Sequence, residues 1–218
     1  MKVVVFGSGS FGTAMAAAVA RNGHHVVILT RRDEVMKGIN HKRHNPLHLK
    51  EFKLSTRITA DTDAFRALLD AEVIINAIPM QFTEKFLRGV RKYIGKNILV
   101  VNTSKGLCEE TLELAYEIFA KVLGAEHPCA FFGGPTFAKE LIIGMPSGGV
   151  MASINLATAE RAAAVFSGPT MRIYPSEDVI GVELGGALKN VIAILAGGLE
   201  GMGLGMNAQT LLVTRGCR

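Results

Sequence analysis

The chain has 218 residues, of which 49% are hydrophobic and 20% charged, so it can bury a core and does not belong to the disordered class. Its net charge of +5 is mild, and aromatic residues make up 6% with no Trp, which argues against a nucleic-acid partner and is equally explained by an anionic small substrate. The cysteines Cys108, Cys129 and Cys217 are odd in number and form no CxxC pair, which argues against a disulfide-stapled secreted domain and favours a reducing, cytoplasmic compartment. A plastid location stays open, because a removed transit peptide would leave no trace in this sequence.

Short β-branched runs alternate with helical patterns along most of the chain. The predicted strands are Val3–Phe6, His25–Leu29, Glu72–Ile78 and Asn97–Asn102, with weaker candidates at Ala130–Gly133, Gly148–Ala152 and Met171–Tyr174. The predicted helices are Thr13–Arg21, Asp33–Asn40, Asp61–Leu69, Phe82–Tyr93, Glu109–Leu123 and Ala157–Phe166. Strands that are apolar on both faces and separated by helices predict an α/β fold, a Rossmann-type, mainly parallel sheet with helices on both faces.

The pattern changes after Ser176, where we place a domain boundary. Residues 1–176 are predicted to form a dinucleotide-binding domain, and residues 177–218 the beginning of an all-α domain for substrate and catalysis. Val179–Leu199 and Asn207–Thr214 have helical spacing, and their apolar faces need a partner. We therefore expect the second domain to be truncated. The weakly charged stretch Ile192–Met206 contains Glu200 and several glycines, so no membrane span is predicted.

A glycine-rich loop follows the first predicted strand. Gly7, Gly9 and Gly12 form a G-x-G-x-x-G pattern that runs into the helix at Thr13. In such a loop the first glycine permits a tight turn, the second lets the backbone approach a pyrophosphate, and the third lets helix and strand pack closely. The free N–H groups at the helix N-terminus favour an anion. This context predicts a dinucleotide-binding loop rather than an ordinary βα turn.

The end of the second predicted strand reads Thr30-Arg31-Arg32. NAD-binding proteins place an acidic residue at this point, about 20 residues beyond the glycines, to bind the ribose 2′-hydroxyl. Arg31 and Arg32 are instead suited to the 2′-phosphate of NADP. The cofactor is therefore NAD or NADP, with NADPH slightly favoured. The alternative is that both arginines form a solvated helix start.

Two lysines have unusual surroundings. The helical neighbours of Lys189 are small or apolar, namely Gly185, Gly186, Ile192 and Ala193. Most lysines are surface residues, but a lysine buried in such a groove gives up its proton more readily and can act as an acid or base near neutral pH. Asn190 adds an amide beside it. Lys105 follows the predicted strand Asn97–Asn102, at the sheet edge where parallel sheets bind ligands, and is placed for a phosphate.

Other strand ends also carry ligand-type loops. Pro79 follows the strand Glu72–Ile78, and Gly134 lies in the loop 133–139 after Ala130–Gly133. Metal chemistry is not predicted, because His41 and His44 have no third ligand at suitable spacing. The sequence contains no GxSxG elbow for a covalent nucleophile.

These motifs together resemble the NAD(P)-dependent glycerol-3-phosphate dehydrogenases, most closely the bacterial and plastid types. The matching stretches are Gly7–Ala16, Asn45-Pro46, Ala77–Pro79 with Gln81, Ser104–Leu107, Gly134–Glu140 and Gly181–Asn190. The last two are the most specific in combination. The resemblance runs from end to end of the chain.

The resemblance implies reversible hydride transfer between NAD(P)H and C2 of dihydroxyacetone phosphate, giving sn-glycerol 3-phosphate for glycerolipid synthesis. It implies that Lys189 is the acid/base, with Asn190 as the adjacent amide, and that Lys105 contacts cofactor and substrate. The implied substrate contacts are Gly134 and Thr136, and the implied cofactor contacts are Ser10, Phe11, Arg31 and Ala138. Family members are usually homodimers.

The sequence also departs from the family pattern. Members are longer, and their further helices carry an aspartate partner of the lysine and an Arg-Asn pair for the substrate phosphate, neither of which has a counterpart before Arg218. Met206 and Gln209 also differ from the usual family residues. Two alternatives therefore stay open: a catalytically incompetent dinucleotide-binding module, and a related two-domain reductase of the ketopantoate reductase or β-hydroxyacid dehydrogenase type.

Overall fold

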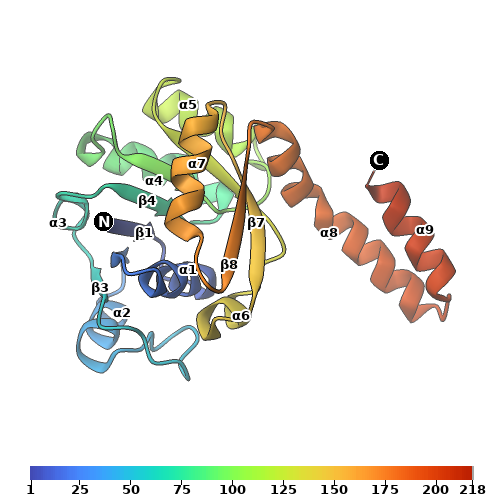
Figure 1. Ribbon diagram of the computed structural model, residues 1–218, viewed down its shortest axis with the longest axis horizontal. Coiled ribbons are helices and arrows are strands. Elements are labelled where there is room, and N and C mark those ends of the chain that lie inside the picture. Colours follow the sequence, from blue (N-terminus) through green and yellow to red (C-terminus); the bar gives the residue numbers. More distant parts are fainter. Residues whose placement is uncertain (218) are drawn as a thin grey trace.

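A computed structural model describes residues 1–217, and Arg218, the last residue of the second predicted domain, lies outside the described residues. The core of the molecule is an eight-stranded sheet (Figure 1). Its strands are β1 (Lys2–Phe6), β2 (His25–Leu29), β3 (Ile58–Asp61), β4 (Val73–Asn76), β5 (Leu99–Asn102), β6 (Cys129–Gly133), β7 (Ser147–Ala152) and β8 (Met171–Ser176). The spatial order is β3-β2-β1-β4-β5-β6-β7-β8, parallel throughout except for the antiparallel pair β6–β7. The predicted fold class is confirmed.

Helices cover both faces of this sheet. They are α1 (Ser10–Arg21), α2 (Asp33–Lys37), α3 (Ala64–Leu68), α4 (Met80–Val90), α5 (Ala115–Leu123), α6 (Ala138–Ile143) and α7 (Leu156–Phe166), with a π-helix at Gly38–Lys42 and a 3-10 turn at Arg91–Tyr93. Successive strand residues point to opposite faces, so Val3 and Val5 pack with α1, α6 and α7, whereas Val4 and Phe6 pack with α3, α4 and α5. Both faces being buried explains why the central strands are apolar throughout.

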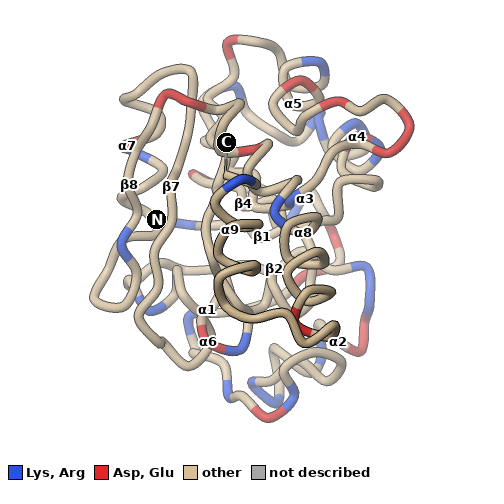
Figure 2. Tube along the Cα trace, turned by 90° about the vertical axis from the view of Figure 1, so that its right-hand side faces the viewer, with Lys and Arg blue, Asp and Glu red and all other residues tan. Residues whose placement is uncertain are grey.

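The remaining two helices leave the sheet. α8 (Val179–Gly201) starts at Asp178, whose carboxylate accepts a hydrogen bond from Gly181 N at 2.8 Å. It projects away from the sheet, and α9 (Met206–Gly216) folds back beside it (Figure 1). Figure 2 looks onto this end and shows few charged residues along the two helices. They carry a set of exposed apolar side chains that includes Leu188, Val191 and Ile194.

By length and composition alone, α8 meets the requirement for a membrane span. An 18-residue window has a mean hydropathy of 1.7, and 6% of it is buried. Its first turns nevertheless pack on the sheet, where Val182 contacts β6 at Gly133. The expected absence of a membrane partner stays a prediction.

Two elements were not predicted from the sequence. β3 lies at the edge of the sheet, and α6 is a single short helix after the loop 134–137. The predicted helix Asp61–Leu69 was wrong at its start, because Asp61 ends β3 and α3 begins at Ala64. Only Ile58 and Ala60 of β3 are buried, so its apolar signal is two residues long.

Candidate active site

The glycine-rich loop lies where the sequence predicts it, between β1 and α1. Gly7 has a φ of 101°, which favours glycine, and a Cβ on Gly12 would lie 2.2 Å from the carbonyl oxygen of Gly7. A Cβ on Gly9 would meet nothing within 4 Å, so the loop is open on the side where a ligand approaches. Gly9 is the N-cap of α1 and supplies no side-chain cap, which leaves the first N–H groups of the helix to a pyrophosphate. Ser10 and Phe11 form the first turn.

A buried asparagine supports this loop from a separate segment. Asn45 is fully buried, and its Nδ2 donates to the carbonyl oxygen of Ser8 at 2.8 Å and to Thr13 Oγ1 at 2.9 Å. Its Oδ1 accepts from Leu47 N and His48 N. Asn45-Pro46 is one of the stretches that resemble the family, but the resemblance implies no role for Asn45. The structure shows a residue that fixes the phosphate loop, and no local sequence signal points to this contact.

The hydrogen bond from His48 N to Asn45 also places His48 beside the phosphate loop. His48 Nδ1 lies 3.4 Å from Ser10 Oγ. Sequence reasoning missed His48, because 38 residues separate it from Ser10 and its surroundings follow no motif.

Arg31 and Arg32, the arginines predicted to favour NADP over NAD, follow the carboxyl end of β2. Arg31 and Arg32 are exposed, and Arg32 Nη1 lies 4.0 Å from Glu34 Oε1. Thr30, just before them, is tied to the phosphate loop by a 2.7 Å hydrogen bond between its hydroxyl and that of Ser8. The exposed guanidinium groups therefore lie on the segment next to the loop, and that of Arg32 faces the carboxylate of Glu34.

The ends of β4 and β5 are joined by a buried polar network. Asn76 Nδ2 donates to Asn102 Oδ1 at 3.0 Å, and Thr103 Oγ1 donates to the carbonyl oxygen of Asn76 at 2.7 Å. Asn102 Nδ2 in turn donates to the carbonyl oxygen of Ser104 at 3.0 Å. These hydrogen bonds restrain the segment they connect, and within the described residues Asn76 Oδ1 is left without a partner. They hold the loop that carries Lys105. Pro79, on the neighbouring strand end, is the N-cap of α4.

Lys105 follows β5, at the edge of the sheet where the parallel strands have their carboxyl ends. Its Nζ donates to the carbonyl oxygen of Gly134 at 2.6 Å. Burial, followed by the charge of Lys189, lowers the pKa of Lys105 from its usual value. Gly134 has a φ of 155°, and a Cβ there would approach Gly148 O to 2.8 Å, so only glycine fits this turn. The two predicted ligand loops therefore meet at Lys105.

Two further predicted residues follow Gly134. Thr136 Oγ1 is buried and has no hydrogen-bond partner within the described residues, which leaves it available to a ligand. Ala138 begins α6 and packs partly buried against the core on the α1 side of the sheet. Both thus lie at the edge of the sheet that carries Lys105.

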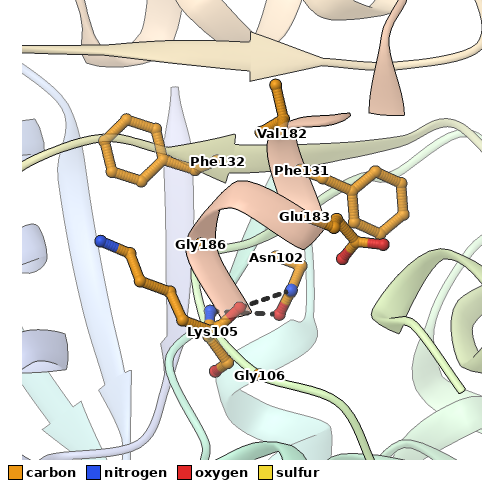
Figure 3. Close-up of a pocket in the computed structure, with 9 residues that line it drawn as sticks. Asn102, Lys105, Gly106, Phe131, Phe132, Val182, Glu183 and Gly186 are labelled. Atoms are coloured by element: carbon orange, nitrogen blue, oxygen red, sulfur yellow. Dashed lines mark hydrogen bonds between the residues drawn. The ribbon is translucent and has the colours of Figure 1, made fainter. Parts of the chain in front are cut away.

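A small cavity lies between the loop that carries Lys105, strand β6 and α8 (Figure 3). Asn102, Lys105 and Phe132 line it from the sheet, and Glu183 and Gly186 line it from α8. In Figure 3 the Lys105 side chain extends along one side of the helix and the Glu183 carboxylate points away on the other. α8 therefore forms one wall of the site.

The prediction that Lys189 is buried in a groove was wrong. Lys189 and Asn190 are exposed, and Lys189 Nζ donates to Asn190 Oδ1 at 2.8 Å. Helical spacing correctly identifies the small neighbours on α8 itself. Lys105 approaches Gly186 and α9 approaches Ile192, but neither covers the Lys189 side chain, which stays exposed. Lys189 is still near enough to Lys105 for its charge to lower the pKa of that lysine.

The described residues contain no group of three or more His, Cys, Asp or Glu side chains that could hold a metal ion. Over the same part of the chain, all three cysteines are free.

A phosphate loop after β1, two arginines after β2 and a lysine after β5, all at one edge of a mainly parallel sheet, define a dinucleotide-binding domain of the Rossmann class. Comparison with known proteins identifies the family within this class. Residues 2–159 match the model for the N-terminus of NAD-dependent glycerol-3-phosphate dehydrogenase, and residues 178–218 match the model for its C-terminus. The chain belongs to the NAD-dependent glycerol-3-phosphate dehydrogenase family.

Individual relatives agree. The chain is 42% identical to the chloroplastic glycerol-3-phosphate dehydrogenase [NAD(+)] 2 of Arabidopsis thaliana over 219 residues, which is 99% of this chain and 52% of that protein. It is 39% identical to glycerol-3-phosphate dehydrogenase [NAD(P)+] of Leptospira biflexa, over 99% of this chain and 66% of that protein. The crystal structure of glycerol-3-phosphate dehydrogenase from Coxiella burnetii superposes with a TM-score of 0.89 at 28% identity, covering 99% of this chain and 66% of that one. The chain thus spans about half to two thirds of the length of these relatives. The family match decides against the ketopantoate reductase and β-hydroxyacid dehydrogenase alternatives.

Proposed function

We propose that this site catalyses reversible hydride transfer between NAD(P)H and C2 of dihydroxyacetone phosphate, giving sn-glycerol 3-phosphate. The observation that carries the proposal is the position of Lys105, half-buried between the loop of Gly134 and the α8 helix that bears Lys189. A cation at that point is suited to an anionic triose phosphate. The names of the relatives in the preceding section support the same substrate.

The residues present fit a dinucleotide. The open side of Gly9 and the free N–H groups of α1 would hold the pyrophosphate, and the nicotinamide cofactor, when bound, supplies the hydride that reduces C2. Lys105 orients the substrate, with the unpartnered hydroxyl of Thr136 as a further contact. Lys189 delivers a proton to the oxygen on C2 as that oxygen gains negative charge, and Asn190 holds the ammonium group in place.

We also infer that NADPH is favoured over NADH. Arg31 and Arg32 are exposed at the strand end where an acidic residue would bind the 2′-hydroxyl of NAD, and guanidinium groups bind phosphate with charge-assisted hydrogen bonds. We further propose a role in glycerolipid synthesis and a homodimeric assembly, because the resemblance to the family implies both, and a cytoplasmic or plastid location. Relatives named as chloroplastic support the plastid location.

A second candidate is a dinucleotide-binding module without turnover. The exposure of Lys189 favours it, because a general acid in bulk solvent is poorly placed on its substrate. The two are separated by titrating the 218-residue chain with NADPH, following the fluorescence of the bound nucleotide, and then adding dihydroxyacetone phosphate. Binding followed by oxidation of NADPH supports hydride transfer by the 218-residue chain. Binding alone shows that this chain acts as a module, and the proposed hydride transfer is then tested in a protein of the length of the relatives.

A further inference from the structure

α8 contacts the sheet through its first two turns. Val182 packs into β6, where a Cβ on Gly133 would lie 2.7 Å from Val182 Cγ1. One turn later, a Cβ on Gly186 would lie 3.7 Å from Lys105 Cγ. Beyond that point α8 no longer contacts the sheet and has only α9 beside it, and the side chain of Ile194 is 74% exposed. The direction in which α8 presents Lys189 is therefore set by these two turns.

Glu183 makes the polar contact of this short interface. Its Oε2 accepts a hydrogen bond from Tyr116 N at 3.0 Å. With a further backbone hydrogen bond from Ala115, it links the Glu183 side chain of α8 to the first turn of α5. Tyr116 is the second residue of α5, so its N–H has no partner within that helix, and the positive end of the helix dipole favours a carboxylate there. Glu183 and Gly186 are three residues apart and share the face of α8 that lines the cavity beside Lys105.

The surroundings of Glu183 disfavour its charge. Burial raises the pKa of Glu183 to about 7, and the nearby charge of Glu117 acts in the same direction, against the hydrogen bonds from Tyr116 and Ala115. The other charged group facing this cavity is Lys105 on the sheet side, and Lys189 follows further along α8.

We propose that Glu183 is a positioning residue, whose hydrogen bond from Tyr116 N fixes α8 against α5 and thereby holds Gly186 against Lys105 and the charge of Lys189 near it. The importance of this for catalysis rests on the proposed function, in which the two lysines act on one substrate. The geometric claim does not depend on it. Removal of the hydrogen bond is expected to let α8 swing away from the sheet, so that Lys105 loses both its cover and the neighbouring charge.

The docked position of α8 should also depend on pH. The carboxyl of Glu183 has a pKa of about 7 when α8 is docked, compared with an ordinary pKa of 4.5. Its protonated form therefore favours docking, and this contribution is greatest at low pH. The contribution of Glu183 to docking therefore falls as the pH rises from about 4.5 to about 7, and is constant above. In Glu183→Gln the amide oxygen accepts the same N–H without ionising, so docking becomes independent of pH in this window.

The first experiment is a titration of Lys105 in the 218-residue chain. Lysines carrying ¹³C-methyl groups are followed by NMR from pH 7 to 11, with Lys105→Arg used to assign the signal. Glu183→Leu is expected to move the pKa of Lys105 back towards its ordinary range, whereas Glu183→Gln keeps it lowered. Glu200→Leu, which removes an exposed acid at the far end of α8, is the matched control and leaves it unchanged.

The second experiment is amide hydrogen exchange of Tyr116 between pH 5 and 8, corrected for intrinsic chemical exchange. Protection in the wild type is expected to fall roughly tenfold or more across this window. Protection in Glu183→Gln stays level. NADPH binding measured on the same samples tests the proposed function separately, since its failure would leave the Lys105 titration unaffected.

The proposal is overturned if Glu183→Leu leaves the titration of Lys105 unchanged, or if Glu183→Gln behaves like Glu183→Leu. Should Glu183→Leu fail to fold, the exchange profile of Glu183→Gln decides alone. A level profile supports the positioning role, and a profile that follows the wild type refutes it.

Discussion

The side chain of Asn45 donates a hydrogen bond to the carbonyl oxygen of Ser8 at 2.8 Å, across 37 residues of sequence. This contact fixes the middle of the phosphate loop from outside the β1–α1 unit, and its second bond, to Thr13, fixes the first turn of α1. The shape of the loop thus depends on a residue that binds no part of the nucleotide itself.

Asn45→Ala is therefore expected to weaken NADPH binding and to lower the free energy of unfolding by about 1–3 kcal/mol, the cost of leaving buried polar groups unpaired. The matched control is Asn40→Ala. Asn40 makes an equivalent pair of bonds to the backbone of Ala60, away from the loop, so its loss should destabilise the chain without changing NADPH affinity. Calorimetric unfolding and NADPH titration measure the two effects. Equal losses of affinity in both variants would contradict the supporting role.

The second prediction concerns Arg31 and Arg32. Replacing both by alanine is expected to weaken NADPH binding by roughly 1–3 kcal/mol more than NADH binding, because only NADPH carries the 2′-phosphate. Lys37→Ala, which removes an exposed cation from the end of α2, controls for a general loss of positive charge. Fluorescence titration with each nucleotide gives the comparison. Equal losses for NADH and NADPH would show that neither arginine contacts the added phosphate.

Sequence reasoning identified the sheet and the ligand loops because their signals are local. A strand that is buried on both faces shows itself by composition, as β2 does, and a phosphate loop by its glycines. β3 was missed because an edge strand needs only one apolar face, here Ile58 and Ala60. The π-helical turn after α2 likewise leaves no periodic signal.

The site was harder to predict where it depends on distant contacts. Helical spacing gives the neighbours of Lys189 on its own helix but not what packs against them, so its burial was predicted wrongly. Glu183 was overlooked for the same reason, since its partner is a backbone N–H in α5. Lys105 was placed correctly because the carboxyl end of a parallel strand fixes its location from the sequence alone.

The third prediction follows from the apolar surface of α8. Val191 and Ile194 are 56% and 74% exposed and lie one turn apart, on a helix with few charges. Exposed apolar patches of this kind drive association. The 218-residue chain is expected to self-associate with rising concentration, and Val191→Lys with Ile194→Lys to shift it towards monomer in sedimentation velocity. Phe82→Lys, at a 63% exposed position on α4, is the control and should leave the association unchanged. A wild-type chain that stays monomeric at all concentrations would contradict the prediction.

The last prediction concerns turnover by the 218-residue chain itself. Asn45 is buried and holds the half-buried phosphate loop through hydrogen bonds, and the buried Asn76 and Asn102 join the strand ends beside Lys105, so NADPH should bind. Catalysis also requires that α8 hold Lys189 in a fixed position relative to the substrate. Lys189 is exposed and is held by Asn190 alone among the described residues, whereas a displacement of ~1 Å of a reacting group costs on the order of 100-fold in rate.

We therefore expect NADPH binding with negligible reduction of dihydroxyacetone phosphate, measured as NADPH oxidation at high protein concentration. Lys189→Ala should leave NADPH affinity unchanged, because the lysine lies outside the phosphate loop. Any residual turnover should fall by about 100-fold or more in that variant, the scale of general acid–base catalysis. Robust turnover by the wild-type chain would show that Lys105 and the Gly134 loop hold the substrate without help. If Lys189→Ala then retained that turnover, the proton would have to come from another group, and the proposed role of Lys189 would be refuted.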